Sequence, residues 1–107
     1  MAKSTISYRK ATLKDVNQIS SVLMDFYNMK DYKEASEAFK SEIKKDINYI
    51  VAVQDDVIVG LVTWLPHGLP KHGLFELDRI CLLSEARGKG VGKGLINELI
   101  IDADKWY

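Results

Sequence analysis

The chain has 107 residues, the size of one small domain, and its 47% apolar and 28% charged residues are typical of a globular protein. Its formal net charge is zero, which argues against a general binder of nucleic acid or of a membrane surface, because such proteins carry a basic excess. The single cysteine, Cys81, excludes an internal disulfide and a cysteine-rich zinc site. The sequence lacks both an apolar run long enough for a membrane span and the apolar core of a signal peptide. We therefore expect a single cytoplasmic domain over residues 1–107.

The first half of the sequence predicts one strand and two helices. Residues 6–11 have the composition of a short strand, and the segment 12–15 that follows resembles a capping box with Asp in place of the usual Glu. Apolar residues then recur at steps of three and four, which predicts a helix with one apolar face: Val16, Ile19, Val22, Leu23 and Phe26. After a break at residues 28–31, a more charged helix is expected over residues 32–45.

The second half predicts three strands and a long helix. Residues 48–54 and 57–65 have strand composition, and the short turn at Asp55 and Asp56 makes them an antiparallel hairpin. Residues 66–73 have loop composition, residues 74–83 read as another strand, and an amphipathic helix runs from Val91 to the end. The order β-α-α-β-β-β-α is that of an α+β, or mixed α/β, layer domain.

Between the last strand and the last helix lies the stretch RGKGVGKG at residues 87–94. A glycine-rich turn that opens a helix suits a phosphate, because the first helical N–H groups have no partner and the helix dipole is positive there. Glycine permits positive φ and close approach of the backbone, and Lys89 and Lys93 add positive charge. We therefore predict a phosphate cradle, with a flexible turn that binds nothing as the alternative.

Two common phosphate-binding patterns do not fit this stretch. The Walker pattern would need Gly at Arg87 and Ser or Thr at Gly94. The dinucleotide pattern G-x-G-x-x-G fails because its last glycine falls on Lys93 or on Leu95, depending on where it starts.

A third pattern fits without a gap. Residues 87–92, RGKGVG, match [QR]-x-x-G-x-[GA], and so resemble the signature of the GNAT superfamily of acetyl-CoA-dependent N-acetyltransferases. Residues 76–87, ELDRICLLSEAR, resemble the fourth strand of that family and the segment after it, and the order of the preceding elements is similar. The resemblance implies a mostly antiparallel central sheet with helices on both faces. It also implies acetyl-CoA as cosubstrate, no metal, and transfer of the acetyl group to the amine of a small molecule, such as a polyamine, or of a protein or peptide.

The resemblance also assigns roles to particular residues. Backbone N–H groups of the glycine loop would hold the pyrophosphate of coenzyme A, which implies a site at Arg87, Gly88, Lys89, Gly90, Val91, Gly92 and Lys93. Backbone groups of the preceding strand would pair with the pantetheine arm like an added strand, which implies Ile80, Cys81 and Leu82. A Glu of that strand often takes the proton of the amine, which implies Glu76 as the base and Asp78 as second choice. For both carboxylates, a solvated outer face is the alternative.

The first two helices of the family often shape the acceptor pocket. This implies Phe26, Tyr27 and Tyr32 as acceptor-binding residues, with Trp64 at the end of its strand lining the same pocket. Acidic residues nearby would attract a cationic acceptor such as a polyamine: Asp25, Asp31 and Glu34. Ordinary packing or a solvated face is the alternative for each of these residues.

Two further candidates have simpler explanations. His67 and His72 would make half of a metal site, but no nearby ligand completes it, so we expect surface histidines. Cys81 would be an acetyl-carrying nucleophile only with a base partner, and none is evident, so we expect a small buried hydrophobic residue.

The family fold usually continues beyond the cofactor-binding helix with a strand, a helix and two more strands, whereas this sequence stops at Tyr107. We therefore expect an exposed apolar sheet edge that favours a homodimer. The alternative to an enzyme is a truncated module that holds coenzyme A, or associates with itself, without catalysis.

Overall fold

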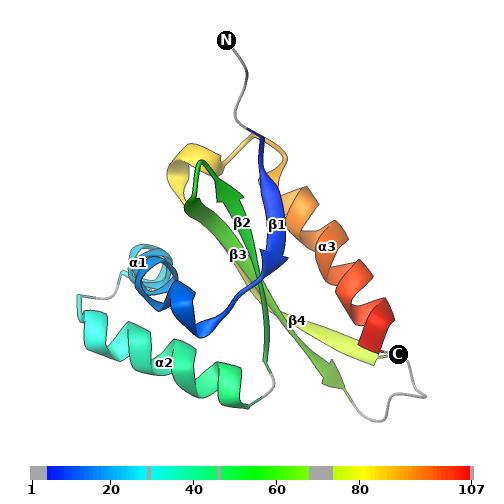
Figure 1. Ribbon diagram of the computed structural model, residues 1–107, viewed down its shortest axis with the longest axis horizontal. Helices are drawn as coiled ribbons and strands as arrows, with labels where there is room; N and C mark the ends of the chain where they lie inside the picture. Colours follow the sequence, from blue (N-terminus) through cyan, green and yellow to red (C-terminus); the bar gives the residue numbers. More distant parts are fainter. Residues whose placement is uncertain (1–4, 29, 46, 68–73, 107) are drawn as a thin grey trace.

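The computed structural model describes residues 5–28, 30–45, 47–67 and 74–106. These form a four-stranded antiparallel sheet in which each strand lies beside the next one in the chain. Two helices cover one face of the sheet and a third covers the other (Figure 1). The predicted mixed α+β architecture, with an antiparallel sheet between helices, is confirmed.

The helices and strands follow the predicted order. Their bounds are β1 Ser7–Lys10, α1 Val16–Tyr27, α2 Tyr32–Lys44, β2 Asn48–Gln54, β3 Val57–His67, β4 Leu74–Leu82 and α3 Val91–Trp106. Single turns of 3-10 helix, η1 (Leu13–Asp15) and η3 (Ser84–Ala86), precede α1 and the glycine-rich stretch. None of these described helices combines the length and the apolar character needed to cross a membrane.

β3 is longer than the sequence predicts, because it continues through Pro66 to His67, where a loop was expected to begin. The register with β2 ends at Trp64, so Pro66 lies on a part of β3 that pairs only with β4. A strand tolerates proline where one side is unpaired, since the missing N–H then costs no ladder bond. The rest of the expected loop, residues 68–73, lies outside the described residues.

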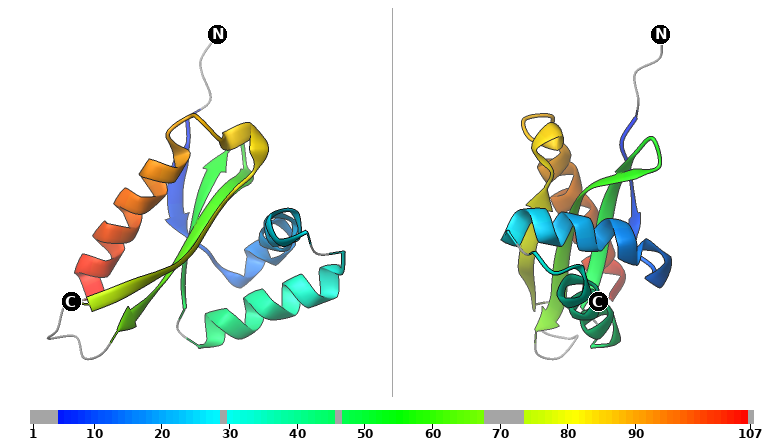
Figure 2. Two further views of the ribbon diagram at one scale, coloured as in Figure 1. Left: turned by 180° about the vertical axis from the view of Figure 1, so that it is seen from behind. Right: turned by 90° about the vertical axis from the view of Figure 1, so that its left-hand side faces the viewer.

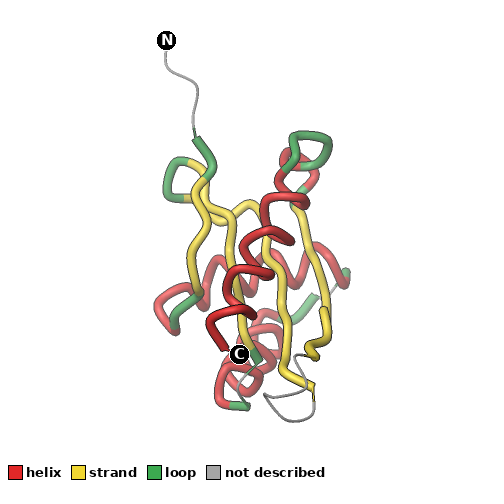
Figure 3. Tube along the Cα trace, turned by 90° about the vertical axis from the view of Figure 1, so that its right-hand side faces the viewer, coloured by secondary structure: helices red, strands yellow, loops and turns green. Residues whose placement is uncertain are grey.

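The sheet separates two apolar cores, because successive strand residues point to opposite faces. Figure 2 shows α1 and α2 against one face, and Figure 3 shows α3 lying along the other. The core under α1 and α2 includes Ile19, Leu23, Phe39, Tyr49, Val51 and Leu61. The core under α3 includes Ile50, Val62, Trp64, Val91, Leu95 and Leu99.

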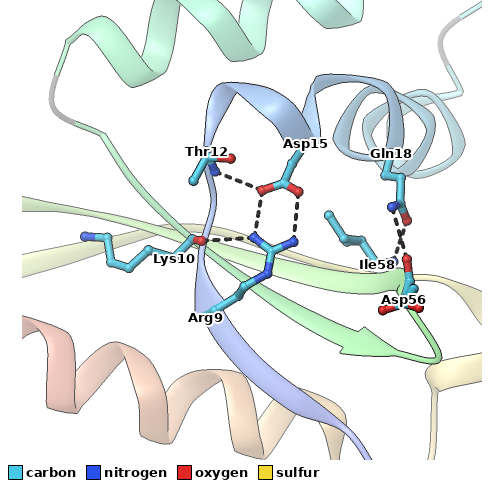
Figure 4. A network of polar contacts seen from close by, with 7 residues as sticks. All are labelled: Arg9, Lys10, Thr12, Asp15, Gln18, Asp56 and Ile58. Carbon is cyan, nitrogen blue, oxygen red and sulfur yellow. Dashed lines mark hydrogen bonds and ion pairs between the residues drawn. The ribbon is translucent and has the colours of Figure 1, made fainter.

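The 3-10 turn η1, which leads directly into α1, is held by the predicted capping box. Asp15 accepts a hydrogen bond from the Thr12 backbone N–H at 2.8 Å and one from each terminal nitrogen of Arg9, both at 2.8 Å (Figure 4). The hydrogen bonds from Arg9 lower the pKa of the Asp15 carboxyl; burial opposes this effect and the Thr12 N–H adds to it. Arg9 lies on β1, so the cap also fastens α1 to the edge of the sheet.

A second contact ties α1 to the β2–β3 turn. The Gln18 side chain accepts a hydrogen bond from the Ile58 N–H at 2.6 Å and donates one to the Asp56 carbonyl at 3.2 Å (Figure 4). Asp55 and Asp56 of this turn both have positive φ, as a tight hairpin turn requires.

Asp102 fastens the last turns of α3 to the sheet. Its carboxylate accepts a hydrogen bond from the Trp64 indole N–H at 2.9 Å and an ion-paired one from Lys10 at 3.0 Å. The Lys10 ammonium also donates to the Asn48 side chain at 2.9 Å. α3 is thereby linked to β1, β2 and β3. These contacts fix the orientation of the helix, and so of its first turn, relative to the sheet.

Candidate functional site

The glycine-rich stretch joins the end of β4 to the start of α3 at one end of the sheet (Figure 1). Gly88 and Gly90 have φ values of 77° and 79°, in the left-handed region that favours glycine. A Cβ added to either residue would meet nothing within 4 Å. Backbone conformation, and not crowding, therefore requires glycine at these two positions.

The other two glycines lie in the first turn of α3 and allow the helix to pack. A Cβ on Gly92 would lie 3.6 Å from Leu82 and 3.8 Å from Ile80, which is ordinary contact. A Cβ on Gly94 would overlap the hydroxyl and ring of Tyr8 on β1. Position 92 thus accepts alanine, as the pattern [QR]-x-x-G-x-[GA] allows, whereas Gly94 is explained by the contact with Tyr8.

The start of α3 presents free backbone donors. The first bond of the helix runs from the Gly94 N–H to the Gly90 carbonyl at 3.0 Å, so the N–H groups between these residues precede the helical ladder. The helix dipole adds partial positive charge, and the exposed Lys89 and Lys93 add full charges. Backbone N–H groups at a turn of this kind form a concave site suited to an anion such as a pyrophosphate.

β4 is an edge strand of the described sheet. The Leu83 N–H donates to β3 at 2.9 Å, and hydrogen-bonded pairs alternate along an antiparallel ladder, so the backbone groups of Cys81 also face β3. Those of Ile80 and Leu82 consequently face outward. The Leu82 carbonyl accepts a hydrogen bond from Arg87 at 3.3 Å, so Arg87 lies beside the open edge. The geometry offers Ile80 and Leu82, but not Cys81, to a strand-like partner.

The Cys81 side chain is buried in the core under α1 and α2. Burial raises the pKa of the thiol to about 11, and the nearby positive charge of Arg79 opposes this shift. A thiol with such a pKa is protonated near pH 7 and is a weak nucleophile. The structure therefore favours the packing role over the nucleophilic one.

A β-bulge in β4 brings Glu76 and Asp78 to the face covered by α1 and α2. The register with β3 shifts after Thr63, so that Asp78 is an extra residue without an opposite partner. The Thr63 hydroxyl donates to the Asp78 carboxylate at 3.2 Å. Glu76 lies opposite Leu65, which is two residues after Thr63 and shares its face. The two predicted carboxylates thus lie together.

Arg79 connects Asp78 to the helices. Its guanidinium donates to the Glu42 carboxylate on α2 and to the Tyr49 hydroxyl at 3.3 Å, and lies 3.3 Å from the Asp78 carboxylate. The Tyr49 hydroxyl donates to Glu42 at 2.9 Å. The guanidinium carbon lies 5.7 Å from the centre of the Tyr27 ring, within the range of a cation–π contact. Sequence reasoning missed this cluster, because Arg79 and Glu42 are 37 residues apart and no local pattern shows that they meet.

The charges of this cluster are set by its surroundings. Burial raises the pKa of the Tyr49 hydroxyl above its usual range, so it remains a neutral donor. Burial also acts to lower the pKa of Arg79, but the charge of the Glu42 carboxylate and its hydrogen bond oppose this effect, and the pKa is raised. Glu76 and Asp78 are both exposed, but Glu76, unlike Asp78, has no hydrogen bond or ion pair with another residue in the described part of the chain. The two carboxylates therefore have different environments on one face.

The structure brings two of the four predicted acceptor residues, Phe26 and Tyr27, into contact, whereas Tyr32 is directed towards the other end of α1. Phe26 and Tyr27 at the end of α1 are 45% and 46% exposed, and their rings meet edge to face at 5.0 Å. The hydroxyl of Tyr32, at the start of α2, hydrogen-bonds to the Asn17 side chain on α1. Trp64 does not join them, since it is buried on the opposite face of the sheet under α3.

Within the ranges that the structure describes, no three His, Cys, Asp or Glu side chains lie together in an arrangement that could hold a metal ion. His72 lies outside the described residues, and only the backbone of His67 is described.

A loop of anion-binding geometry thus lies between an open strand edge and a helix start. The sequence profile of the acetyltransferase (GNAT) family matches residues 16–106. The chain belongs to this family. A comparison with curated protein sequences gave no match.

Solved GNAT structures share this fold. A ribosomal-protein-alanine N-acetyltransferase from Brucella melitensis superposes with a TM-score of 0.79 at 23% identity, over 94% of this chain and 73% of its own. A GNAT family acetyltransferase from the same species, solved with acetyl-CoA, gives 0.74 at 20% identity, over 94% and 70%. An N-acetyltransferase from Staphylococcus aureus gives 0.74 at 22% identity, over 95% and 68%. At these identities the likeness concerns the fold, whereas membership in the GNAT family supports acetyl transfer from acetyl-CoA in general.

Proposed function

We propose that this GNAT protein transfers the acetyl group of acetyl-CoA to an amine by direct attack in a ternary complex. The observation that supports the proposal most is the loop of residues 88–93, which combines two left-handed glycines with the free N–H groups of α3. In the proposal these N–H groups, with Lys89 and Lys93, hold the pyrophosphate. The outward backbone groups of Ile80 and Leu82 bind the pantetheine arm by strand addition.

This arrangement would direct the thioester along β4 towards the bulge at Asp78. When bound, acetyl-CoA supplies a carbonyl carbon that a neutral amine can attack. Glu76 is the proposed base that takes the proton of the amine, directly or through a water molecule. Its carboxylate has no partner among the residues that the structure describes, whereas that of Asp78 is engaged by Thr63 and Arg79. Asp78 then holds the bulge in place and keeps Glu76 on the acceptor face.

Calorimetric titration with acetyl-CoA tests the donor site. We expect the wild type to bind, and Gly90→Ala to bind about 5- to 30-fold more weakly, because a left-handed backbone costs an L-residue about 1–2 kcal/mol. Gly92→Ala is the matched control and should bind like the wild type, since its Cβ has room. Absence of wild-type binding at millimolar acetyl-CoA would refute the proposal.

A transfer assay over amines tests the reaction. Release of the coenzyme A thiol should require both substrates, and Glu76→Gln should lose most of the activity, since general acid–base catalysis contributes typically 10²–10⁴-fold. Asp78→Asn should keep more activity than Glu76→Gln. Tight binding of acetyl-CoA with no transfer to any amine would instead favour a coenzyme A-binding module without catalysis.

A homodimer and a cytoplasmic location remain parts of this proposal. The dimer is supported by the open edge of β4 and by two apolar side chains of that strand, Phe75 and Leu77, which are 39% and 42% exposed.

A further inference from the structure

The acceptor face of the sheet already contains a cation. Arg79 lies over the Tyr27 ring, a place where an acceptor ammonium group would otherwise bind favourably. The side chains of Arg79 and Glu42 are only 18% and 16% exposed, and they are bonded to each other. The Glu42 carboxylate and one face of the Tyr27 ring are therefore taken by a residue of the protein itself.

The remaining negative charge is unevenly available to a ligand. Asp78 is occupied on one side by Arg79 and Thr63. Asp31 caps α2, where its side chain accepts the Lys33 N–H at 2.9 Å. Among the described residues, Glu76 remains as the carboxylate on this face of β4 that has no partner. One ammonium group can thus be neutralised at Glu76, whereas a second one passing along β4 would approach the guanidinium of Arg79 and be repelled.

The same face offers apolar surface beside this charge. The rings of Phe26 and Tyr27 are nearly half exposed, and Tyr27 is placed next to β4 by its contact with Arg79. Because of the bulge, Arg79 and Glu76 lie opposite Thr63 and Leu65 of β3, which are two positions apart, or roughly 7 Å at the usual rise of a strand. An amine whose ammonium group is joined to a ring by a few carbon atoms would reach both the Glu76 carboxylate and the exposed aromatic rings.

From this arrangement we infer that the acceptor is an amine with one ammonium group on an apolar or aromatic arm, and not a polyamine, and that Arg79 determines this preference. The inference rests on the proposed acetyl transfer. It also replaces the polyamine acceptor that the acidic residues of the sequence suggested, because that expectation did not take the positive charge of Arg79 into account.

Two probe amines of similar length distinguish a monoamine acceptor from a polyamine acceptor. 4-Phenylbutylamine has one charge and a ring, and spermidine has three charges and no ring. The wild type should show a higher kcat/KM for 4-phenylbutylamine. In Arg79→Met, which keeps the length of the side chain but removes its charge, the ratio of the two kcat/KM values should move towards spermidine by about tenfold or more. Arg79→Lys retains the charge and should keep the wild-type preference. Tyr27→Ala should weaken only the use of 4-phenylbutylamine.

A merely structural role for Arg79 would lower kcat/KM for both amines equally and leave their ratio unchanged, and that result would overturn the inference. A wild-type preference for spermidine would do the same. Affinity for acetyl-CoA, measured by calorimetry, should stay unchanged in every variant, since the proposed contacts with coenzyme A come from outward backbone groups of β4 and from the glycine loop, and the substitutions change only side chains on the face covered by α1 and α2.

Direct binding separates this inference from the proposed reaction. Each amine is titrated into the wild type and Arg79→Met in the presence of coenzyme A, with the amide resonances of α1 and β4 followed by NMR. The same change of preference without any turnover would support the inference while refuting the transfer reaction. No shift of these resonances with 4-phenylbutylamine would refute the inference even if another amine is acetylated.

Discussion

Gly94 shows how a residue in a ligand-binding motif can be required for a different reason. Its partner is Tyr8, on the opposite edge of the sheet, and the absence of a side chain lets the Tyr8 ring lie against the first turn of α3. Tyr8 therefore fixes the position of the helix start whose N–H groups form the proposed cradle. A residue of β1 in this way supports a site that is built from β4 and α3.

Gly94→Ala should consequently destabilise the protein by about 1–3 kcal/mol, because the new methyl group overpacks the contact with Tyr8. The same substitution in a Tyr8→Ala background removes the overlap. It should there be neutral or stabilising by up to about 1 kcal/mol, the advantage of alanine over glycine in a helix. Urea unfolding of the four proteins measures this coupling. Additive effects of the two substitutions would show that Tyr8 does not constrain α3.

At the scale of the element, α1 depends on the charge of its cap. The pKa of Asp15 is lowered in the folded state, chiefly by hydrogen bonds from Arg9, with burial opposing and the Thr12 N–H assisting. A carboxyl group with a lowered folded-state pKa stabilises the fold above its unfolded pKa of about 4, and this stabilisation is lost as the pH falls through the folded-state value. The Arg9 side chain is 47% exposed, so solvent screens its attraction and reduces the stability that this ion pair contributes.

We therefore expect Asp15→Asn to be less stable than the wild type by about 1 kcal/mol at pH 7, the usual value of a helix cap. The difference should shrink as the pH is lowered from 5 to 3, because the wild-type carboxyl then becomes protonated. Thermal unfolding over this range tests the expectation. Asp104→Asn, at an exposed position on α3, is the control and should differ little from the wild type at every pH. A difference that does not change with pH would assign the effect to shape and not to charge.

The elements themselves were predictable, because they depend on local patterns. The apolar spacing of Ile19 and Leu23 specifies a helix face, and the turn at Asp55 and Asp56 specifies a hairpin. Contacts between distant segments were not predictable in this way. The sequence does not show that Arg79 meets Glu42, nor that Trp64 faces α3, since both depend on which helix covers which face of the sheet.

The candidate site, like the fold, was predictable where it depends on a local pattern and not where it depends on contacts between distant segments. The glycine stretch was located from its composition and motif, and its left-handed positions follow from glycine. The bulge at Asp78 changes which side chains share a face, and strand alternation alone does not reveal a bulge. It brings Arg79 to the same face as Asp78, which changes the interpretation of the acceptor site.

At the scale of the whole molecule, one open edge is assigned two partners. The outward N–H and C=O groups of Ile80 and Leu82 would bind pantetheine, and an unpaired edge also invites β4 of a second copy. Both partners cannot pair with the same groups at once. Because binding equilibria are reciprocal, acetyl-CoA should weaken a dimer formed through this edge, and the dimer should weaken acetyl-CoA binding.

Sedimentation velocity over a range of protein concentrations tests this competition. Without ligand we expect a monomer–dimer equilibrium, and saturating acetyl-CoA should shift it towards the monomer. Leu77→Lys should also favour the monomer, because a charge on an edge strand opposes pairing with another chain. Ser7→Lys on β1, the opposite edge, is the control and should leave the equilibrium unchanged. A dimer that persists at saturating acetyl-CoA but is disrupted by Leu77→Lys would place the interface at the Phe75–Leu77 end of β4, away from Ile80 and Leu82. A monomer at every concentration would exclude the homodimer.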